Sequence, residues 1–288
     1  MFERQRSGSV VCSNCGRLVG VNDERCLGCG KWNPSLWGWE PVLKKLTQGF
    51  SFGEVVLWGA VLIYAATLFY DTEGIRSGGL MSMLSPSMKS LYQFGMSGAV
   101  PIFVEGRWWT VLSAAWLHGG LLHIGFNLMW IRQLAPAVGE LYGTSRLVLI
   151  YTAGAVGGFG LTSLVALAPL PGPLAGAFFT VGASAPLFGL FGALYHYGHR
   201  TGNRTISQQY MQFLVIWVVI GVVLGFGSQQ GIRIDNWAHL GGFLGGMVAA
   251  RWLDPLKDEK PGHIIAALVC LVAMAASLVL SFISPSQL

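Results

Sequence analysis

The stretch Trp116-Leu-His118-Gly-Gly-Leu-Leu-His123-Ile-Gly-Phe-Asn127 places ionisable and amide side chains at the start of a long apolar segment. His123 and Asn127 are four residues apart, so in a helix they share one face. Polar groups inside a membrane span are costly, and they mark candidate functional sites. The stretch therefore predicts a membrane helix with a polar site near one end.

The composition of the whole chain favours a membrane protein. Of the 288 residues, 53% are hydrophobic and only 11% are charged, against about 25% charged residues in a soluble domain. So few charges cannot cover a soluble globule of this size, and the high hydrophobicity excludes intrinsic disorder. The net charge of +5 is spread along the chain and does not indicate nucleic-acid binding. We predict an all-α polytopic membrane protein.

Seven apolar segments are long enough, or nearly so, to cross the hydrocarbon core as helices. They are residues 53–70, 121–138, 146–167, 181–197, 210–226, 237–253 and 264–283. With a cytoplasmic N-terminus, 14 of the 18 Lys and Arg residues lie on the cytoplasmic side, as the positive-inside rule requires. The C-terminus and the polar site are then near the outer face of a plasma (inner) membrane. No signal-peptide pattern opens the chain.

Residues 71–118 separate the first two spans and are too many for a simple connector. They include Pro86, Pro101 and the adjacent Trp108 and Trp109, and tryptophan favours the membrane interface. We predict an ordered loop with short helices, lying partly in the outer interface. A flexible extracellular loop is the alternative.

Four of the five cysteines form two Cys-x-x-Cys-Gly motifs, at Cys12 and Cys15 and at Cys26 and Cys29. Four thiolates in a small unit suit tetrahedral Zn²⁺, and a reducing cytoplasm disfavours disulfides. We predict a structural zinc site without a catalytic role, because four protein ligands leave no open position. Two disulfides or a redox pair are the alternatives. Cys270, in the last span, is interpreted as a small buried hydrophobe.

Two further spans carry polar residues near their outer ends. Ser184 begins one of them, and His239 follows the start of the other. A serine hydroxyl is a poor nucleophile until a base takes its proton, and histidine is the usual base. Gly241, Gly242, Gly245 and Gly246 make two small-x-x-x-small patterns that let helices approach closely. If the partner is the fourth span, His239 reaches Ser184.

The tetrahedral intermediate of such a reaction needs donors for its oxyanion. His123, the Asn127 amide and the backbone N–H of Ser184 are the candidates. Asp235, four residues before His239, is interpreted as the N-cap of the sixth span. A third catalytic carboxylate is the alternative reading of Asp235.

These residues resemble the rhomboid intramembrane serine proteases. The resemblance rests on the stretch from Trp116 to Asn127, on Gly182-Ala-Ser184 and on Ala238-His239-Leu-Gly-Gly242 with Gly246, in the family's chain order over about residues 53–253. It implies a six-helix core and a Ser184–His239 dyad with no third carboxylate. It also implies an oxyanion hole lined by His123 and Asn127, with His118 and Gly182 supporting the site. The implied reaction is hydrolysis of peptide bonds in or beside transmembrane helices that enter from the bilayer, without a cofactor.

Two positions depart from the family pattern. Ala185 follows the nucleophile where the family has glycine, and Pro186 comes next. The family's Trp-Arg pair in the first loop falls on Trp109 and Thr110, so we expect the arginine's anchoring contacts to be missing, although Arg107 stands nearby. Neither departure removes a dyad member, but both bear on rate and specificity.

We therefore predict a cytoplasmic zinc-ribbon-like module at residues 1–40, a linker at 41–52 and a six-span protease core at 53–253. A cytoplasmic loop and an accessory seventh transmembrane helix follow at 254–288. Expected partners are transmembrane substrates, lipid and a cytoplasmic partner of the zinc module, with no nucleic acid. The alternatives are an inactive rhomboid-like protein that binds and regulates client transmembrane helices, and a transporter or channel. The chain lacks the paired interrupted spans and the intramembrane carboxylates typical of the last class.

Overall fold

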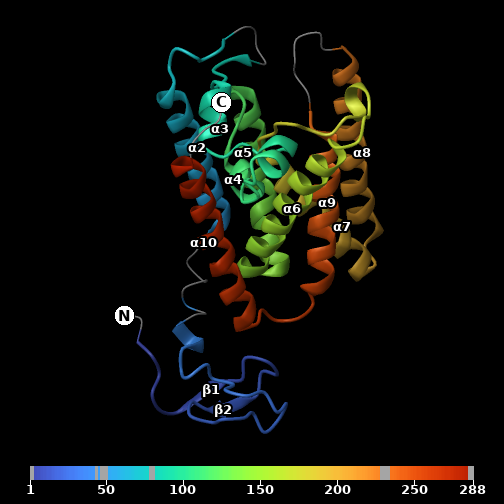
Figure 1. The fold of residues 1–288 in the computed structure, drawn as a ribbon. Coiled ribbons are helices and arrows are strands. Elements are labelled where there is room, and N and C mark those ends of the chain that lie inside the picture. The colour runs from blue at the N-terminus through green and yellow to red at the C-terminus, as the bar shows by residue number, and fades with distance from the viewer. Residues whose placement is uncertain (1–2, 43–44, 46–50, 78–81, 228–233, 285–288) are drawn as a thin grey trace.

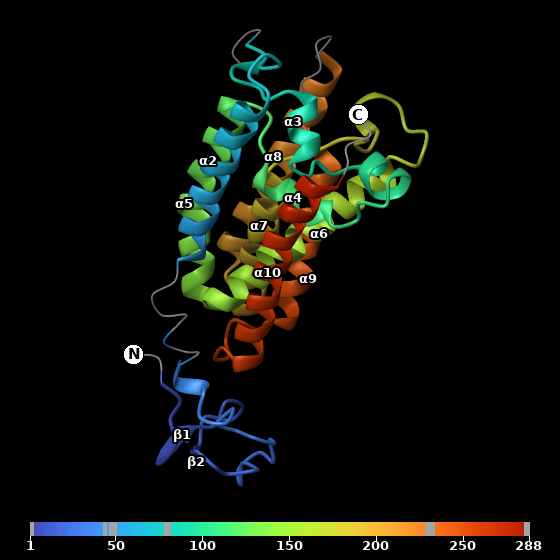
Figure 2. The ribbon, with the colours of Figure 1, turned by 60° about the vertical axis from the view of Figure 1, so that its left-hand side comes forward.

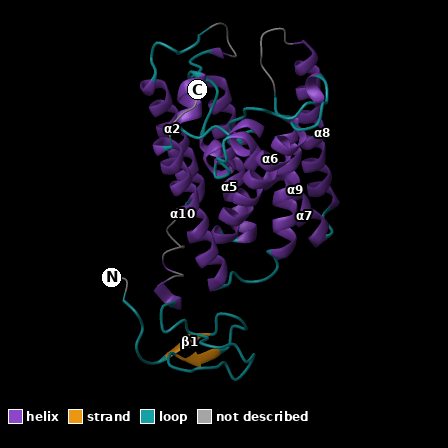
Figure 3. Ribbon diagram, viewed as in Figure 1, coloured by secondary structure: helices purple, strands orange, loops and turns teal. Residues whose placement is uncertain are grey.

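The computed structural model describes residues 3–42, 45, 51–77, 82–227 and 234–284. Residues 43–44 and 46–50 of the predicted linker lie outside this part of the chain. The described residues form a small two-stranded unit followed by a bundle of helices (Figures 1 and 3). The predicted all-α membrane architecture with a cysteine module at its N-terminal side is confirmed.

The N-terminal unit is built on one short hairpin. Strand β1 (Ser9–Val11) pairs antiparallel with β2 (Leu18–Gly20), with Val10 opposite Val19. A few valines and two of the cysteines make its core. Strands of three residues cannot hold such a unit together alone, so its stability depends on the cysteine cluster described below.

Each of the seven predicted spans coincides with one long helix and overruns its ends by at most three residues. The helices are α2 (Phe52–Tyr70), α5 (Leu121–Tyr142), α6 (Thr144–Val165), α7 (Ser184–Thr201), α8 (Arg204–Gly227), α9 (Asn236–Trp252) and α10 (Pro261–Ile283). Among the described residues, α2, α6, α8 up to Leu224 and α10 are long and apolar enough to cross a membrane. Helices α5, α7 and α9, which carry the polar site residues, do not meet both conditions, and α9 has only 17 residues. That all seven cross the membrane stays a prediction.

Some helix boundaries differ from the predicted ones by three to six residues. Helix α8 begins at Arg204, six residues early, and α5 continues past Pro136 to Tyr142. Helix α7 begins only at Ser184, because the residues before it bond through their backbone to residues 97–100 and to Ala114. The beginnings of α5, α7 and α9 lie toward the end of the bundle opposite the N-terminal unit (Figures 1 and 2).

Helix α9 packs between α6 and α7 through backbone rather than side chains. A Cβ added to Gly246 would lie 2.0 Å from the carbonyl oxygen of Gly189, and one added to Gly242 would lie 2.1 Å from that of Ala185. These glycines therefore set the separation of α9 and α7. The fourth span is thus a partner of the sixth, which is the condition on which the contact between His239 and Ser184 depended.

The segment between α2 and α5, residues 71–120, is called the outer loop below. It contains short helices, as predicted: α3 (Met88–Gln93), the π-turn η2 (Val100–Val104), α4 (Thr110–Ser113) and the 3₁₀ turn η3 (Ala114–Trp116). A second 3₁₀ turn, η4 (Gly172–Leu174), lies between α6 and α7. Helix α10 packs against α6 and α4, so it also touches the outer loop (Figure 2).

We predict that Gly246→Ala destabilises the bundle, whereas Gly160→Ala does not. The added methyl of the first variant meets a carbonyl oxygen, and overpacking of this kind costs about 1–3 kcal/mol in the free energy of unfolding. Gly160, on α6, has nothing within 4 Å of its missing Cβ, so alanine is expected to gain about 0.5–1 kcal/mol there. Thermal unfolding in detergent measures both variants. Equal midpoints would contradict the packing argument.

Candidate active site

The centre of the site is a contact between α7 and α9. The Oγ atom of Ser184 lies 3.0 Å from Nε2 of His239, which is hydrogen-bond distance. His239 is 6% exposed, so water has little access to the imidazole. The structure thus brings together the two residues predicted to form a nucleophile and its base.

The beginning of α9 is fixed by Asp235. Its Oδ1 atom accepts hydrogen bonds from the backbone N–H of Ala238, at 3.0 Å, and from the hydroxyl of Thr162, at 2.8 Å. This is the predicted N-cap, and Thr162 ties the cap to α6. Among the described residues, Nδ1 of His239 has no hydrogen-bond partner. The geometry therefore supports a pair rather than a triad.

An aromatic ring holds the imidazole in place. The Phe188 ring stacks on His239 with 4.1 Å between ring centroids and 7° between planes. Phe188 lies on α7 one helical turn after Ser184, so both side chains project from the same face toward α9. Sequence reasoning missed this residue, although its spacing of four from the predicted nucleophile was available as a signal.

His123, on α5, lies on the other side of Ser184. Its Nδ1 atom accepts a hydrogen bond of 3.2 Å from the backbone N–H of Gly119, so the neutral ring carries its hydrogen on Nε2. A Cβ added to Gly182 would lie 2.7 Å from that Nε2 and 3.5 Å from Oγ of Ser184. Gly182 therefore leaves the space between a ring N–H donor and the serine open.

Asn127 and His118 reach the site only through His123. The Asn127 amide donates to the backbone carbonyl of His123 at 2.8 Å, and it lies on the same face of α5 one turn further into the bundle. The buried ring of His118 meets the His123 ring edge-on, with centroids 5.2 Å apart. The described contacts thus join Ser184, His239, Gly182 and His123 directly, and the other two indirectly.

The backbone around the serine is that of a helix N-terminus. Ser184 and Ala185 are the first two residues of α7, and their N–H groups have no acceptor within the helix. The helix dipole also favours negative charge at this end. Pro186 is the third helical residue, where its missing N–H removes no intrahelical bond.

The structure accommodates the departure at Ala185. Its methyl group lies 2.7 Å from the position that a Cβ on Gly158 would occupy, so it fills a space that α6 leaves by having glycine. Ala185 is 1% exposed. The methyl therefore packs against Gly158 of α6. The space that Gly182 leaves beside His123 is a different one.

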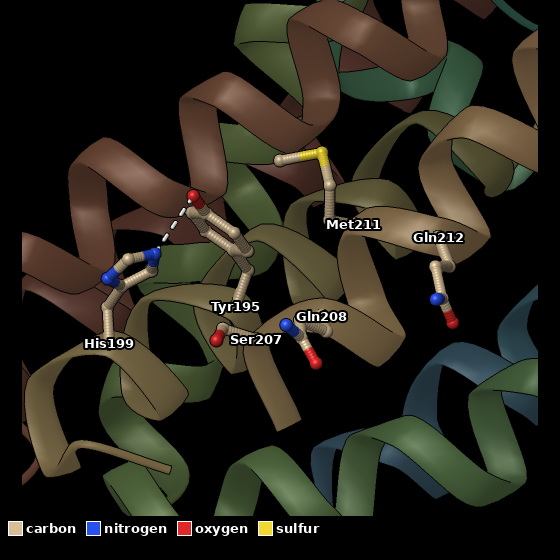
Figure 4. A pocket seen from close by; sticks show the side chains of 6 residues that line it. All are labelled: Tyr195, His199, Ser207, Gln208, Met211 and Gln212. Atoms are coloured by element: carbon tan, nitrogen blue, oxygen red, sulfur yellow. Dashed lines mark hydrogen bonds between the residues drawn. The ribbon is translucent and has the colours of Figure 1, made fainter. Parts of the chain in front are cut away.

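A cavity of about 420 Å³ lies between α7 and α8 and is separate from this site. Figure 4 shows its side chains, which are Tyr195, His199, Ser207, Gln208, Met211 and Gln212. The Tyr195 hydroxyl and Nε2 of His199 are 3.1 Å apart. Tyr195 is eleven residues beyond Ser184, or roughly 16 Å along the helix at 1.5 Å per residue. The cavity is therefore too remote to hold a peptide bond at Ser184.

The four cysteines of the N-terminal unit form a candidate metal centre. Their sulfur atoms all lie within 4.8 Å of one another; Cys12 and Cys29 are 3.8 Å apart, and Cys15 and Cys26 are 3.5 Å apart. Four sulfurs at about 2.3 Å from one Zn²⁺ would be about 3.8 Å apart in a tetrahedron. All four thiols are free, which disfavours the disulfide alternative. The cluster can bind a metal ion.

Local hydrogen bonds help one of these ligands to ionise. The Asn14 side chain, and then the backbone N–H of Lys31, lower the pKa of the Cys29 thiol to about 6. A lowered pKa means that the thiolate is present at neutral pH and is lost as the pH falls through 6. Because metals bind thiolates, acid is expected to weaken binding.

The fold and these contacts define a class: an all-helical membrane protein that holds a serine hydroxyl and an imidazole in hydrogen-bond contact at the ends of two inner helices. The rhomboid-domain family profile matches residues 105–254, which is more than half of the chain, and the chain belongs to the rhomboid family. The expected family membership is confirmed.

Relatives carry the same family name. The chain is 32% identical over 191 residues to rhomboid protease GluP of Bacillus subtilis, covering 66% of this chain and 35% of that protein. It is 30% identical over 205 residues to RHOMBOID-like protein 7 of Arabidopsis thaliana, covering 68% and 61%. It is 26% identical over 213 residues to rhomboid-like protease 3 of Toxoplasma gondii, covering 74% of each. The chain thus spans only part of the first two relatives.

We predict that Phe188→Leu lowers the turnover number on a transmembrane substrate by about threefold to tenfold, whereas Phe188→Tyr retains it. An aromatic pair is worth about 0.5–1.5 kcal/mol, and each 1.4 kcal/mol is about tenfold in rate. Leucine removes the stacking but keeps an apolar side chain. Unfolding midpoints measured alongside separate positioning from stability. A Phe188→Leu variant with full turnover would show that the ring does not position the imidazole.

We predict that the purified protein contains about one zinc ion per chain and that Cys26→Ser loses it. Replacing one of four thiolates removes a quarter of the coordination shell. Cys270→Ser, on α10 away from the cluster, is the matched control and retains the metal. Elemental analysis by mass spectrometry measures the content. Equal zinc in the two variants would contradict the site.

Proposed function

We propose that this protein is an intramembrane serine protease that cleaves peptide bonds in or beside the transmembrane helices of substrate proteins. The observation that carries the proposal is the 3.0 Å contact between Ser184 Oγ and His239 Nε2 inside a helix bundle of the rhomboid family. Its relatives include proteins named as proteases, which supports hydrolase chemistry.

In the first step the Ser184 hydroxyl attacks the substrate carbonyl carbon, and its proton passes to Nε2 of His239. We assign the stabilisation of the resulting oxyanion to the Nε2–H of His123 and the Ser184 backbone N–H, with the Asn127 amide, which bonds the His123 carbonyl, as a third donor. His239 then gives its proton to the leaving amine, the C–N bond breaks, and an acyl ester on Ser184 remains.

In the second step water replaces the amine. His239 takes a proton from the water as its oxygen attacks the ester carbonyl, and the same donors hold the second oxyanion. The ester bond then breaks, Ser184 regains a proton from His239, and the new carboxylic product leaves. No metal or cofactor takes part in this scheme, so we assign a structural role to a metal ion bound by the cysteine cluster.

The position of the pair also suggests what the substrate must do. An intact transmembrane helix hides its carbonyls in hydrogen bonds to residues four positions on. Substrate segments with helix-destabilising residues are therefore expected to be cleaved best, after they enter from the bilayer.

The topology is part of the same proposal. The N-terminal unit and the loop before α10 lie in the cytoplasm, and the dyad lies near the outer face of a plasma (inner) membrane. We retain the division into a zinc module at 1–40, a linker at 41–52, a core at 53–253 and a final loop and helix at 254–288. The zinc module is proposed to contact a cytoplasmic partner.

Labelling with a fluorescent fluorophosphonate tests the dyad directly. The wild-type protein is expected to label, whereas Ser184→Ala and His239→Ala are expected to lose at least nine-tenths of the signal, because one lacks the nucleophile and the other its base. Ser163→Ala is the matched control, since its buried hydroxyl bonds only to its own helix. Cleavage of a transmembrane substrate in liposomes is measured in parallel.

The two readouts separate the proposal from its rival. A folded wild type that neither labels nor cleaves would overturn the protease function. If that protein still bound transmembrane segments, it would be an inactive rhomboid-like protein that regulates client membrane proteins.

A further inference from the structure

The outer end of α10 is joined to the outer loop by a buried polar contact. Oγ of Ser281 lies 3.1 Å from Nε1 of Trp109, which donates to it, and 3.4 Å from Oγ of Ser113. The Ser281 backbone carbonyl accepts a hydrogen bond of 3.0 Å from the guanidinium of Arg107. A Cβ on Gly95 would lie 2.4 Å from Oγ of Ser281, so the helix and the loop are in close contact.

Arg107 is the main link in this contact. Its side chain is 4% exposed, and its guanidinium also donates to the backbone carbonyl of Tyr92 at 3.2 Å and lies 4.5 Å from the centroid of the Tyr92 ring. A buried charge is costly unless it is well bonded, and the planar fork of arginine can bond two carbonyls at once. Arg107 thus anchors the outer loop to α10 from a position three residues before Thr110, where the family pattern has arginine.

The same loop is bonded to the segment that leads into the nucleophile. The Thr110 hydroxyl lies 3.3 Å from that of Ser97. Ser97 and Thr180 exchange both backbone hydrogen bonds, at 3.1 and 2.7 Å, and the N–H of Gly182 donates to the carbonyl of Ala114 at 2.9 Å. A continuous series of hydrogen bonds therefore runs from α10 through Arg107, Thr110 and Ser97 to Thr180, four residues before Ser184.

The other end of α10 is fixed independently. The buried Arg146 of α6 donates to the backbone carbonyls of Leu253, Asp254 and Lys257, at 3.2, 2.6 and 2.7 Å. Glu259 accepts from the Arg146 backbone N–H at 2.9 Å. Because these bonds fix the loop before α10 to α6, the helix is held to the core at both ends and can serve as a support for the outer loop.

We propose that α10 is part of the catalytic scaffold, and that Arg107 and Ser281 are positioning residues that set the outer loop and, through it, residues 177–182 before Ser184. The inference rests on the proposed protease function and deepens it. It also revises the expectation that the seventh helix is accessory.

The test compares Arg107→Met, Ser281→Leu and Ser284→Leu in the full-length protein. Methionine keeps the length of the arginine but removes its donors, and leucine at 281 removes the acceptor and does not fit against Gly95. Among the described residues, Ser284, the C-cap of α10, bonds only to Leu280, so Ser284→Leu is the matched control. Unfolding midpoint, labelling rate of Ser184, and kcat and KM on a transmembrane substrate are measured for each.

At a temperature where every variant is folded, Arg107→Met and Ser281→Leu are expected to label and turn over about tenfold more slowly per folded molecule. KM changes by less than threefold, because the dyad rather than the substrate contact is displaced. Arg107→Lys, which keeps donors at this position, is expected to recover part of the rate. Ser284→Leu behaves as wild type.

Two results would overturn the proposal. One is a lower unfolding midpoint with wild-type labelling and turnover per folded molecule, which makes α10 a stabiliser only. The other is an equal loss in Ser284→Leu. If Arg107→Met does not fold, the double variant Ser113→Cys/Ser281→Cys takes its place. Oxidation joins the two cysteines in a disulfide, and the oxidised form must then label faster than the reduced form. Equal labelling rates in the two forms would refute the link. Failure of the wild type to label refutes the protease function instead.

Discussion

The separation of α9 from its neighbours is the constraint on which the site depends. A hydrogen bond of 3.0 Å between side chains as short as serine and histidine requires the two helix backbones to approach closely. Gly242 and Gly246 permit that approach, since any side chain there would overlap a carbonyl oxygen of α7. In a membrane no hydrophobic effect drives apolar helices together, so close backbone packing has to supply the attraction itself.

Close packing also bears on the proposed dyad, because it offers a way to orient the imidazole without a third carboxylate. A carboxylate would orient the imidazole but would be expensive to bury among apolar helices. Here the imidazole is oriented by the stacked ring of Phe188 and by its place on a rigid helix whose first turn is capped by Asp235. Phe188 is apolar, and the Asp235 carboxylate lies at the beginning of α9, where it accepts a backbone hydrogen bond. No charge is therefore placed beside the histidine inside the bundle.

The sequence predicted the elements that depend on local pattern. Apolar length located all seven helices, the shared depth of polar residues and the rhomboid resemblance suggested that Ser184 and His239 lie together, and the two Cys-x-x-Cys-Gly motifs located the metal cluster. What it could not predict depends on contacts between distant segments. Helix α7 starts at Ser184 because Ser97 pairs with Thr180, and Arg107 meets a carbonyl 174 residues away. The role of Phe188 depends on the rotation of α7 about its axis, which spacing alone does not fix.

The position of polar groups on α10 follows from the same physics. An apolar helix in lipid can slide or rotate at small cost, because one aliphatic side chain packs much like the next. A serine on such a helix is stable only where it finds partners, and Ser281 finds Trp109 and Ser113 at the outer loop. Arg107 adds a buried charged donor that would lose one of its two carbonyl acceptors if the helix moved by one residue. These few polar contacts therefore fix the register of α10, while the apolar surface provides its attraction to the core.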